Sequence, residues 1–204
     1  LTTGDDNVAI GASALLASTV ASDCIAIGSS ALEAVNHDDA SGSVGIGYRA
    51  LTALTAGRRN VAIGYNAGLE TIEANSSIAI GYQALFGDAG IEHSNNIAIG
   101  SSNSDGTLAA MGGQWLTGAS TNNIAIGTGS MSGAMNDSHN NTAVGHLSSS
   151  AITTGDGNVA MGSYALGAML TGLSNVAIGG YDGTTAGALR TSTAAGQCVA
   201  IGTG

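Results

Sequence analysis

The side chains that could carry out catalysis are few in this chain and stand far apart. The four histidines are separate, and none belongs to a His-Glu-x-x-His pattern; they are His37, His93, His139 and His146. Nucleophilic catalysis needs a base beside its nucleophile, and glycoside hydrolysis needs two carboxylates across the substrate. The glycine-rich segment 127–133 lacks the lysine of a phosphate-binding loop. We therefore predict no catalytic residue and no enzymatic activity.

Possible metal ligands gather at two places, Asp5-Asp6 and His37-Asp38-Asp39. Carboxylate oxygens and imidazole nitrogens bind divalent cations. Short acidic segments between repeats are nevertheless typical of solvated turns, and the calcium-binding nonapeptide of β-helical repeats is absent from the sequence. The sequence predicts no metal site and no cofactor.

The composition limits the fold and the partners. The chain has 204 residues, of which 33 are glycine and none is proline; aromatic residues are 3 % and charged residues 9 %. A hydrophobic content of 44 % argues against disorder, and the lack of proline argues against collagen. A net charge of −10 disfavours nucleic-acid binding. The sequence contains no apolar run of about 20 residues, which a membrane-spanning helix would need. No signal peptide is visible.

A five-residue word of the type Asn-Val-Ala-Ile-Gly recurs eleven times along the whole chain. Its closing glycines are Gly11, Gly28, Gly47, Gly64, Gly81, Gly100, Gly127, Gly145, Gly162, Gly179 and Gly202. Most spacings are 17–19 residues, and the exceptions are 27 and 23. Such a repeat indicates a solenoid. We expect residues 1–204 to form one repeat domain, a fragment of a longer fibrous protein.

The word is apolar at three consecutive positions. Its second residue is β-branched in all copies, the third is Ala except at Gly45, and the fourth is Ile except at Val144 and Met161. Side chains alternate along a strand, so both faces of this strand are apolar and should be buried. We expect the second and fourth residues to fill the coil, leaving the Ala face, for example Ala79 and Ala98, to pack against identical chains.

The rest of each repeat suggests corners and turns. The closing glycine is expected at a corner that needs positive φ or close backbone approach. Asn opens seven of the words, so its side chain can bond to turn backbone and form a ladder along the coils. An Ala-Leu pair after the glycine, as in Ala14-Leu15, predicts a second short strand, and the Gly/Ser/Thr/Asn/Asp residues an outer turn. The fold class is therefore all-β: a parallel β-solenoid of about eleven coils.

Cys24 and Cys198 occupy the same column of the repeat, nine coils apart. Coils stack at about 4.8 Å, whereas a disulfide joins Cα atoms within about 7 Å. The sequence predicts two free cysteines in the place of Asn.

The repeat resembles two related families. The word Asn-x-Ala-Ile-Gly-x-x-Ala-Leu is similar to the repeats of YadA-like heads in trimeric autotransporter adhesins, which form a left-handed parallel β-roll. Its usual period of 17 residues is closer to the repeat regions of phage tail fibres. The resemblance covers essentially the whole chain and implies a homotrimer, in which each chain binds two further copies of itself.

Three departures from the repeat are candidates for receptor contact. Tyr48, Tyr65 and Tyr82 follow the glycine in three consecutive coils, and such a row suits a glycan or protein contact. Stacking that merely stabilises the solenoid also explains it. Insertion loops are expected near 101–122, which holds Trp115, and near 180–197. Trp115 either contacts a receptor or fills a gap beneath its own loop.

Together these features predict the structural and adhesive shaft or head of a phage tail fibre. It would lie on the virion, outside the cell, and attach to a glycan or protein of a bacterial surface. The alternative is the head of a trimeric autotransporter adhesin on a bacterial cell surface, which binds host matrix or cells. An ice-binding solenoid is disfavoured because the outer threonines, such as Thr2 and Thr153, are scattered.

Overall fold

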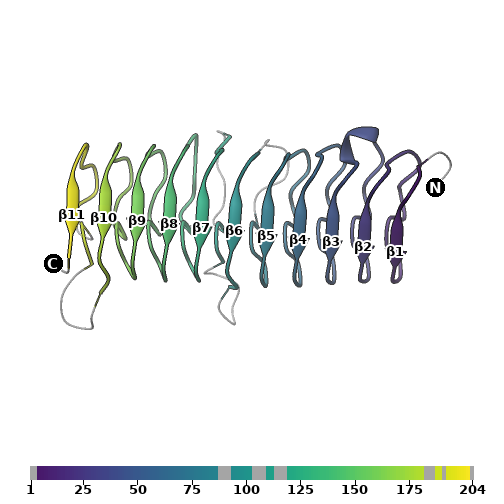
Figure 1. The fold of residues 1–204 in the computed structure, drawn as a ribbon, viewed down its shortest axis with the longest axis horizontal. Coiled ribbons are helices and arrows are strands. Elements are labelled where there is room, and N and C mark those ends of the chain that lie inside the picture. The colour runs from purple at the N-terminus through teal and green to yellow at the C-terminus, as the bar shows by residue number, and fades with distance from the viewer. Residues whose placement is uncertain are drawn as a thin grey trace.

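The chain forms a rod in which one short strand per coil lies along a single long side. The computed structural model describes residues 4–86, 93–102, 109–112, 119–181, 187–189 and 192–202. The strands are β1 (Val8–Ile10), β2 (Ile25–Ile27), β3 (Val44–Ile46), β4 (Val61–Ile63), β5 (Ile78–Ile80), β6 (Ile97–Ile99), β7 (Ile124–Ile126), β8 (Thr142–Val144), β9 (Val159–Met161), β10 (Val176–Ile178) and β11 (Val199–Ile201). They pair in chain order as one parallel 11-stranded sheet (Figure 1).

Every strand pairs with the next in the register that the repeat predicts. Ala62 lies opposite Ala79, and Val61 opposite Ile78. Even the 27-residue interval keeps this register, because Ala98 lies opposite Ala125. The predicted parallel β-solenoid is therefore confirmed. The extra residues of long repeats are added outside the strands, where they leave the sheet undisturbed.

The strand faces are oriented opposite to our expectation. The central Ala side chains point into the coil, and Ala26, Ala62 and Ala98 are all fully buried within one chain. The second and fourth residues of the strands point outward and are half-buried or exposed in all eleven strands. The prediction that the Ala face awaits a partner is wrong. The coil is thin, and only a methyl group fits between the sheet and the opposite wall.

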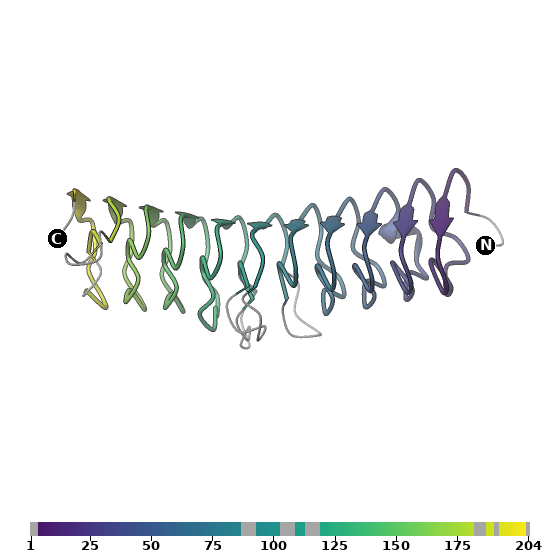
Figure 2. The same cartoon turned by 90° about the horizontal axis from the view of Figure 1, so that it is seen from below.

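In the described residues the opposite wall consists of turns and not of a second strand. In Figure 2 the strands line one side of the rod and the turns the other. Leu15 has a φ of +52° and Leu32 a φ of +51°, which is the left-handed region and excludes an extended strand. Their N–H groups still bond to the next coil, Leu15 to the carbonyl of Ala31 at 3.1 Å. Leu32 and Leu51 are buried and complete the core against the alanines.

The closing glycines form the corners, as predicted. All eleven have positive φ, between +118° at Gly202 and +152° at Gly100. A Cβ on Gly64 would lie 2.4 Å from the carbonyl oxygen of Gly81 in the next coil. Both positive φ and close backbone approach therefore require glycine at this corner.

The asparagines form the predicted ladder inside the coil. The Oδ1 atom of Asn141 accepts the backbone N–H of Asn158 at 2.9 Å, and Nδ2 of Asn141 donates to the carbonyl of Gly155 at 2.7 Å. In the next coil, Oδ1 of Asn158 likewise accepts the backbone N–H of Asn175, and Nδ2 of Asn158 donates to the carbonyl of Gly172. Both cysteines are free, and buried Cys24 takes the place of Asn in this column. Each buried amide thus ties its own turn to the following coil.

Candidate functional site

The outward side of the sheet carries an apolar stripe that one chain leaves uncovered. Each strand contributes its second and fourth side chains, which are Val, Ile or Met apart from Thr142. The in-register pairing aligns them in two straight columns. Ile63 in β4 and Ile126 in β7, away from the ends of these columns, are 38 % and 37 % exposed. Continuous exposed apolar surfaces of this kind are characteristic of interaction sites in proteins.

A stacked row of tyrosines borders this stripe where the strands end. Tyr48, Tyr65 and Tyr82 follow the corner glycines of β3, β4 and β5. The ring centroids of Tyr48 and Tyr65 lie 4.9 Å apart, those of Tyr65 and Tyr82 5.5 Å, with interplanar angles of 25°. The rings therefore cover each other's faces. What the row presents is ring edges and hydroxyl groups, which favours hydrogen bonding over stacking with a sugar ring.

A second aromatic row lies at the same edge and was missed by the sequence analysis. His146 follows the corner after β8, and its ring lies 5.5 Å from that of Tyr164 in an edge-to-face arrangement. Tyr181 continues the row at 5.5 Å from Tyr164. Tyr164 and Tyr181 stand two residues after the corner glycine instead of one, which hid the pattern. With Tyr48, Tyr65 and Tyr82, all five tyrosines of the chain follow the strand ends.

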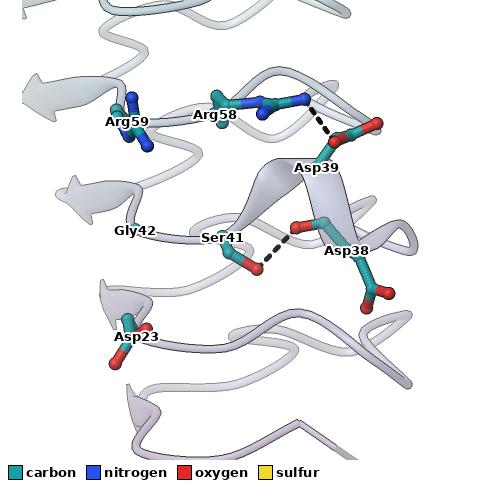
Figure 3. Close-up of a pocket in the computed structure, with 7 residues that line it drawn as sticks. All are labelled: Asp23, Asp38, Asp39, Ser41, Gly42, Arg58 and Arg59. Carbon is teal, nitrogen blue, oxygen red and sulfur yellow. Dashed lines mark hydrogen bonds and ion pairs between the residues drawn. The ribbon is translucent and has the colours of Figure 1, made fainter.

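The edge at which the strands begin is different in character. The residue two places before each strand is in the left-handed region, with φ of +58° at Asp23, +73° at Gly42 and +58° at Arg59. Figure 3 shows these three residues in a column at the starts of β2, β3 and β4. Asp23 and Arg59 make no ion pair with any other described residue. At the starts of β2 and β4 this edge therefore carries exposed charge instead of aromatic rings.

A polar cavity of about 230 Å³ lies between this edge and a single 3₁₀ turn, η1 (Asp38–Ala40). The sequence analysis placed His37-Asp38-Asp39 in a solvated turn. The structure shows that Nδ1 of His37 caps η1 by accepting the N–H of Asp39 at 3.1 Å. Arg58 points away from Arg59 and forms an ion pair with Asp39 (Figure 3). Charges of both signs surround the cavity, which is lined by Asp23, Asp38, Asp39, Ser41, Gly42, Arg58 and Arg59.

The histidines lie in different surroundings, and none faces another. His93 is buried, and its Nδ1 accepts the N–H of Ser120 at 3.1 Å; burial lowers the pKa of His93 to about 4. Nε2 of His139 contacts the carboxylate of Asp137 at 2.9 Å. Within the described residues, no three His, Cys, Asp or Glu side chains are grouped so that they could hold a metal ion. No helix in these parts of the chain is long and apolar enough to cross a membrane.

The predicted receptor residue Trp115 lies outside the described residues, as do most of the insertion near 101–122 and residues 182–186 and 190–191 of the insertion near 180–197. Of the predicted receptor residues, the structure brings together Tyr48, Tyr65 and Tyr82 and places them beside the apolar stripe.

None of the family models, curated proteins or solved structures compared with the chain matches it.

Proposed function

We propose that three copies of this chain assemble side by side, with their apolar stripes facing a common axis, into a rigid adhesive rod. The observation that carries this proposal is the stripe itself, which runs over β1 to β11 with Thr142 as its one polar side chain. Burying such a surface away from water is favourable, whereas leaving it exposed promotes aggregation. A further copy of the chain covers it along its full length because the two surfaces have the same repeat.

The size of the stripe suits a permanent interface. Two side chains from each of eleven strands give 22 apolar or half-apolar side chains per chain. A standard stable interface uses about 20–30 residues from each partner, and obligate interfaces are the more apolar ones. The stripe is only two side chains wide, so three narrow sheets can close around an axis. The resemblance of the repeat to trimeric fibres and adhesin heads supports three copies.

Within this proposal the rod is the shaft or head of a phage tail fibre and lies on the virion, outside the cell. The role is structural and adhesive, without a catalytic step, and the partner is a glycan or protein of the bacterial surface. A regular solenoid offers a repetitive surface of small side chains. Binding energy is concentrated in Trp, Tyr and Arg residues, so contact falls to the insertion with Trp115 or to the tyrosine row.

Attachment to cells tests the function. Fluorescently labelled protein is incubated with a panel of bacterial strains, and bound fluorescence is measured. We expect saturable binding to at least one strain, and we expect Trp115→Ala to reduce it while the molecular mass and melting temperature stay unchanged. Tyr65→Leu is the matched variant. If only Tyr65→Leu reduced attachment, and its molecular mass showed an intact trimer, the receptor contact would belong to the tyrosine row. If no strain bound the protein, the adhesive role would be contradicted.

A further inference from the structure

The two edges of the sheet differ in what they offer to a neighbouring chain. The edge where the strands end carries Tyr48, Tyr65 and Tyr82, each between 38 % and 48 % exposed. Within the described residues, none of these three hydroxyl groups makes a hydrogen bond. The edge where the strands begin carries Arg59, whose guanidinium makes no ion pair or hydrogen bond to another described residue. One edge thus offers acceptors and the other a donor.

Three-fold symmetry brings these unlike edges together. All strands of the sheet run in one direction. In a parallel trimer with the stripes facing the axis, each interface is heterologous, so the strand ends of one chain meet the strand starts of the next. Coils of equal number lie at the same height. Arg59 immediately precedes the coil word of β4 and Tyr65 immediately follows it, so the two belong to the same level.

We propose that Arg59 of each chain donates hydrogen bonds to the tyrosine hydroxyls of its neighbour's row in the assembled trimer. This contact rests on the proposed trimer. The guanidinium has five N–H donors that point in several directions, so it can donate to more than one hydroxyl of a row whose ring centroids lie 4.9 and 5.5 Å apart. The row is centred on the level of Arg59, because Tyr48 and Tyr82 lie one coil below and one coil above Tyr65. A shift of one coil between chains still leaves Arg59 a tyrosine partner.

Arg58 shows why Arg59 is the residue available for this contact. Both arginines are exposed and adjacent in sequence. The side chain of Arg58 extends to Asp39 of its own chain, whereas Arg59 remains at the start of β4 (Figure 3). The three stacked rings have little freedom because each is held by its neighbour. We call the contact between Arg59 of one chain and the tyrosine row of its neighbour the seam. The seam is preorganised on the tyrosine side, so that only the arginine side chain has to become ordered when the chains associate.

A pair of introduced cysteines tests this seam. In a Cys24→Ser, Cys198→Ser background, Arg59→Cys is combined with Tyr65→Cys. The Cα atoms of an arginine and a tyrosine joined by a hydrogen bond lie farther apart than the roughly 7 Å that a disulfide allows, so a short bis-maleimide cross-linker is used in place of oxidation. Within one chain the two positions are separated by the whole of β4, at about 3.3 Å per residue, and lie at opposite edges of the sheet. The cross-linker should therefore give covalent trimers on a denaturing gel. The control combines Arg58→Cys with Tyr65→Cys and should give far less of this product.

Side-chain variants test the hydrogen bond separately from proximity. Arg59→Ala and Tyr65→Phe should each lower the melting temperature of the trimer, by about 2–4 °C, and the double variant should lower it no further than the larger single effect. Arg58→Ala should have a smaller effect. If the protein is a trimer but the cysteine pair gives no covalent product and Arg59→Ala leaves the melting temperature unchanged, the seam is overturned and the proposed trimer is not. A monomer in light scattering would overturn the proposed trimer together with the seam.

Discussion

At the residue scale, His93 is the group whose protonation should be felt most by the fold. It lies inside the coil that precedes β6, and its Nδ1 accepts the N–H of Ser120 from the next coil. Burial lowers its pKa from 6.5 to about 4. Because a protonated His93 would be a buried cation that has lost its acceptor nitrogen, the folded chain keeps the neutral form through neutral pH.

This shift predicts a loss of stability in mild acid. The unfolded chain, with a pKa near 6.5, takes up the proton first, so the free energy of unfolding falls as the pH drops from 6.5 to 4 and levels off below. The part due to His93 is at most about 3 kcal/mol. Urea midpoints at pH 7.5 and 4.5 should show a larger acid loss for the wild type than for His93→Gln. Equal losses would contradict this role of His93.

The corner glycines were predictable because a single physical requirement, positive φ with no room for Cβ, selects one residue type. The other left-handed positions were not. Leu15, Leu32 and Leu51 adopt φ near +52° although leucine does not favour this region. Their burial and their hydrogen bonds to the next coil offset that local preference. The Ala-Leu pair therefore suggested a strand where the structure has a turn.

At the element scale, the alternation of the strand was predictable but its direction was not. A period of two separates Val61 and Ile63 from Ala62 without telling which face is inside. The decisive quantity is the thickness of the coil, which the turns and Leu51 set together. The near-constant Ala at the third position of the word could have indicated that this position faces inward. A confined inner position accepts only one small residue type, whereas an outer position accepts several types. The aromatic edge was only half visible, since two tyrosines are displaced by one residue.

Two neighbouring substitutions in β6 should separate folding from assembly. Ala98→Glu places a carboxylate inside the coil without a partner, at a cost of several kcal/mol, and should abolish the β-sheet signal in circular dichroism. Ile99→Glu points outward, so the coil should remain folded while association of the chains is lost. Equal loss of the β-sheet signal in both variants would argue against the orientation of the strand.

At the scale of the whole molecule, the chain is a thin rod with three distinct long surfaces. The apolar stripe lies on the outward side of the sheet, the tyrosines follow the strand ends, and exposed charges such as Arg59 precede the strand starts. The core consists mainly of Ala, Leu, Met, Ser and Asn, whereas most of the β-branched side chains of the strands lie on the outward stripe. The strands on either side of the long repeats pair in register. The length of a repeat can therefore vary without disturbing the arrangement of the three surfaces.

The molecular mass in solution tests the central claim most directly, because assembly through the stripe underlies both the rod and the seam. Multi-angle light scattering coupled to gel filtration, at micromolar concentration and neutral pH, measures it without reference to any receptor. The account predicts a single species of three times 19.7 kDa, with the β-sheet signal of a folded chain. A stable, folded species of 19.7 kDa that neither associates nor aggregates would contradict it.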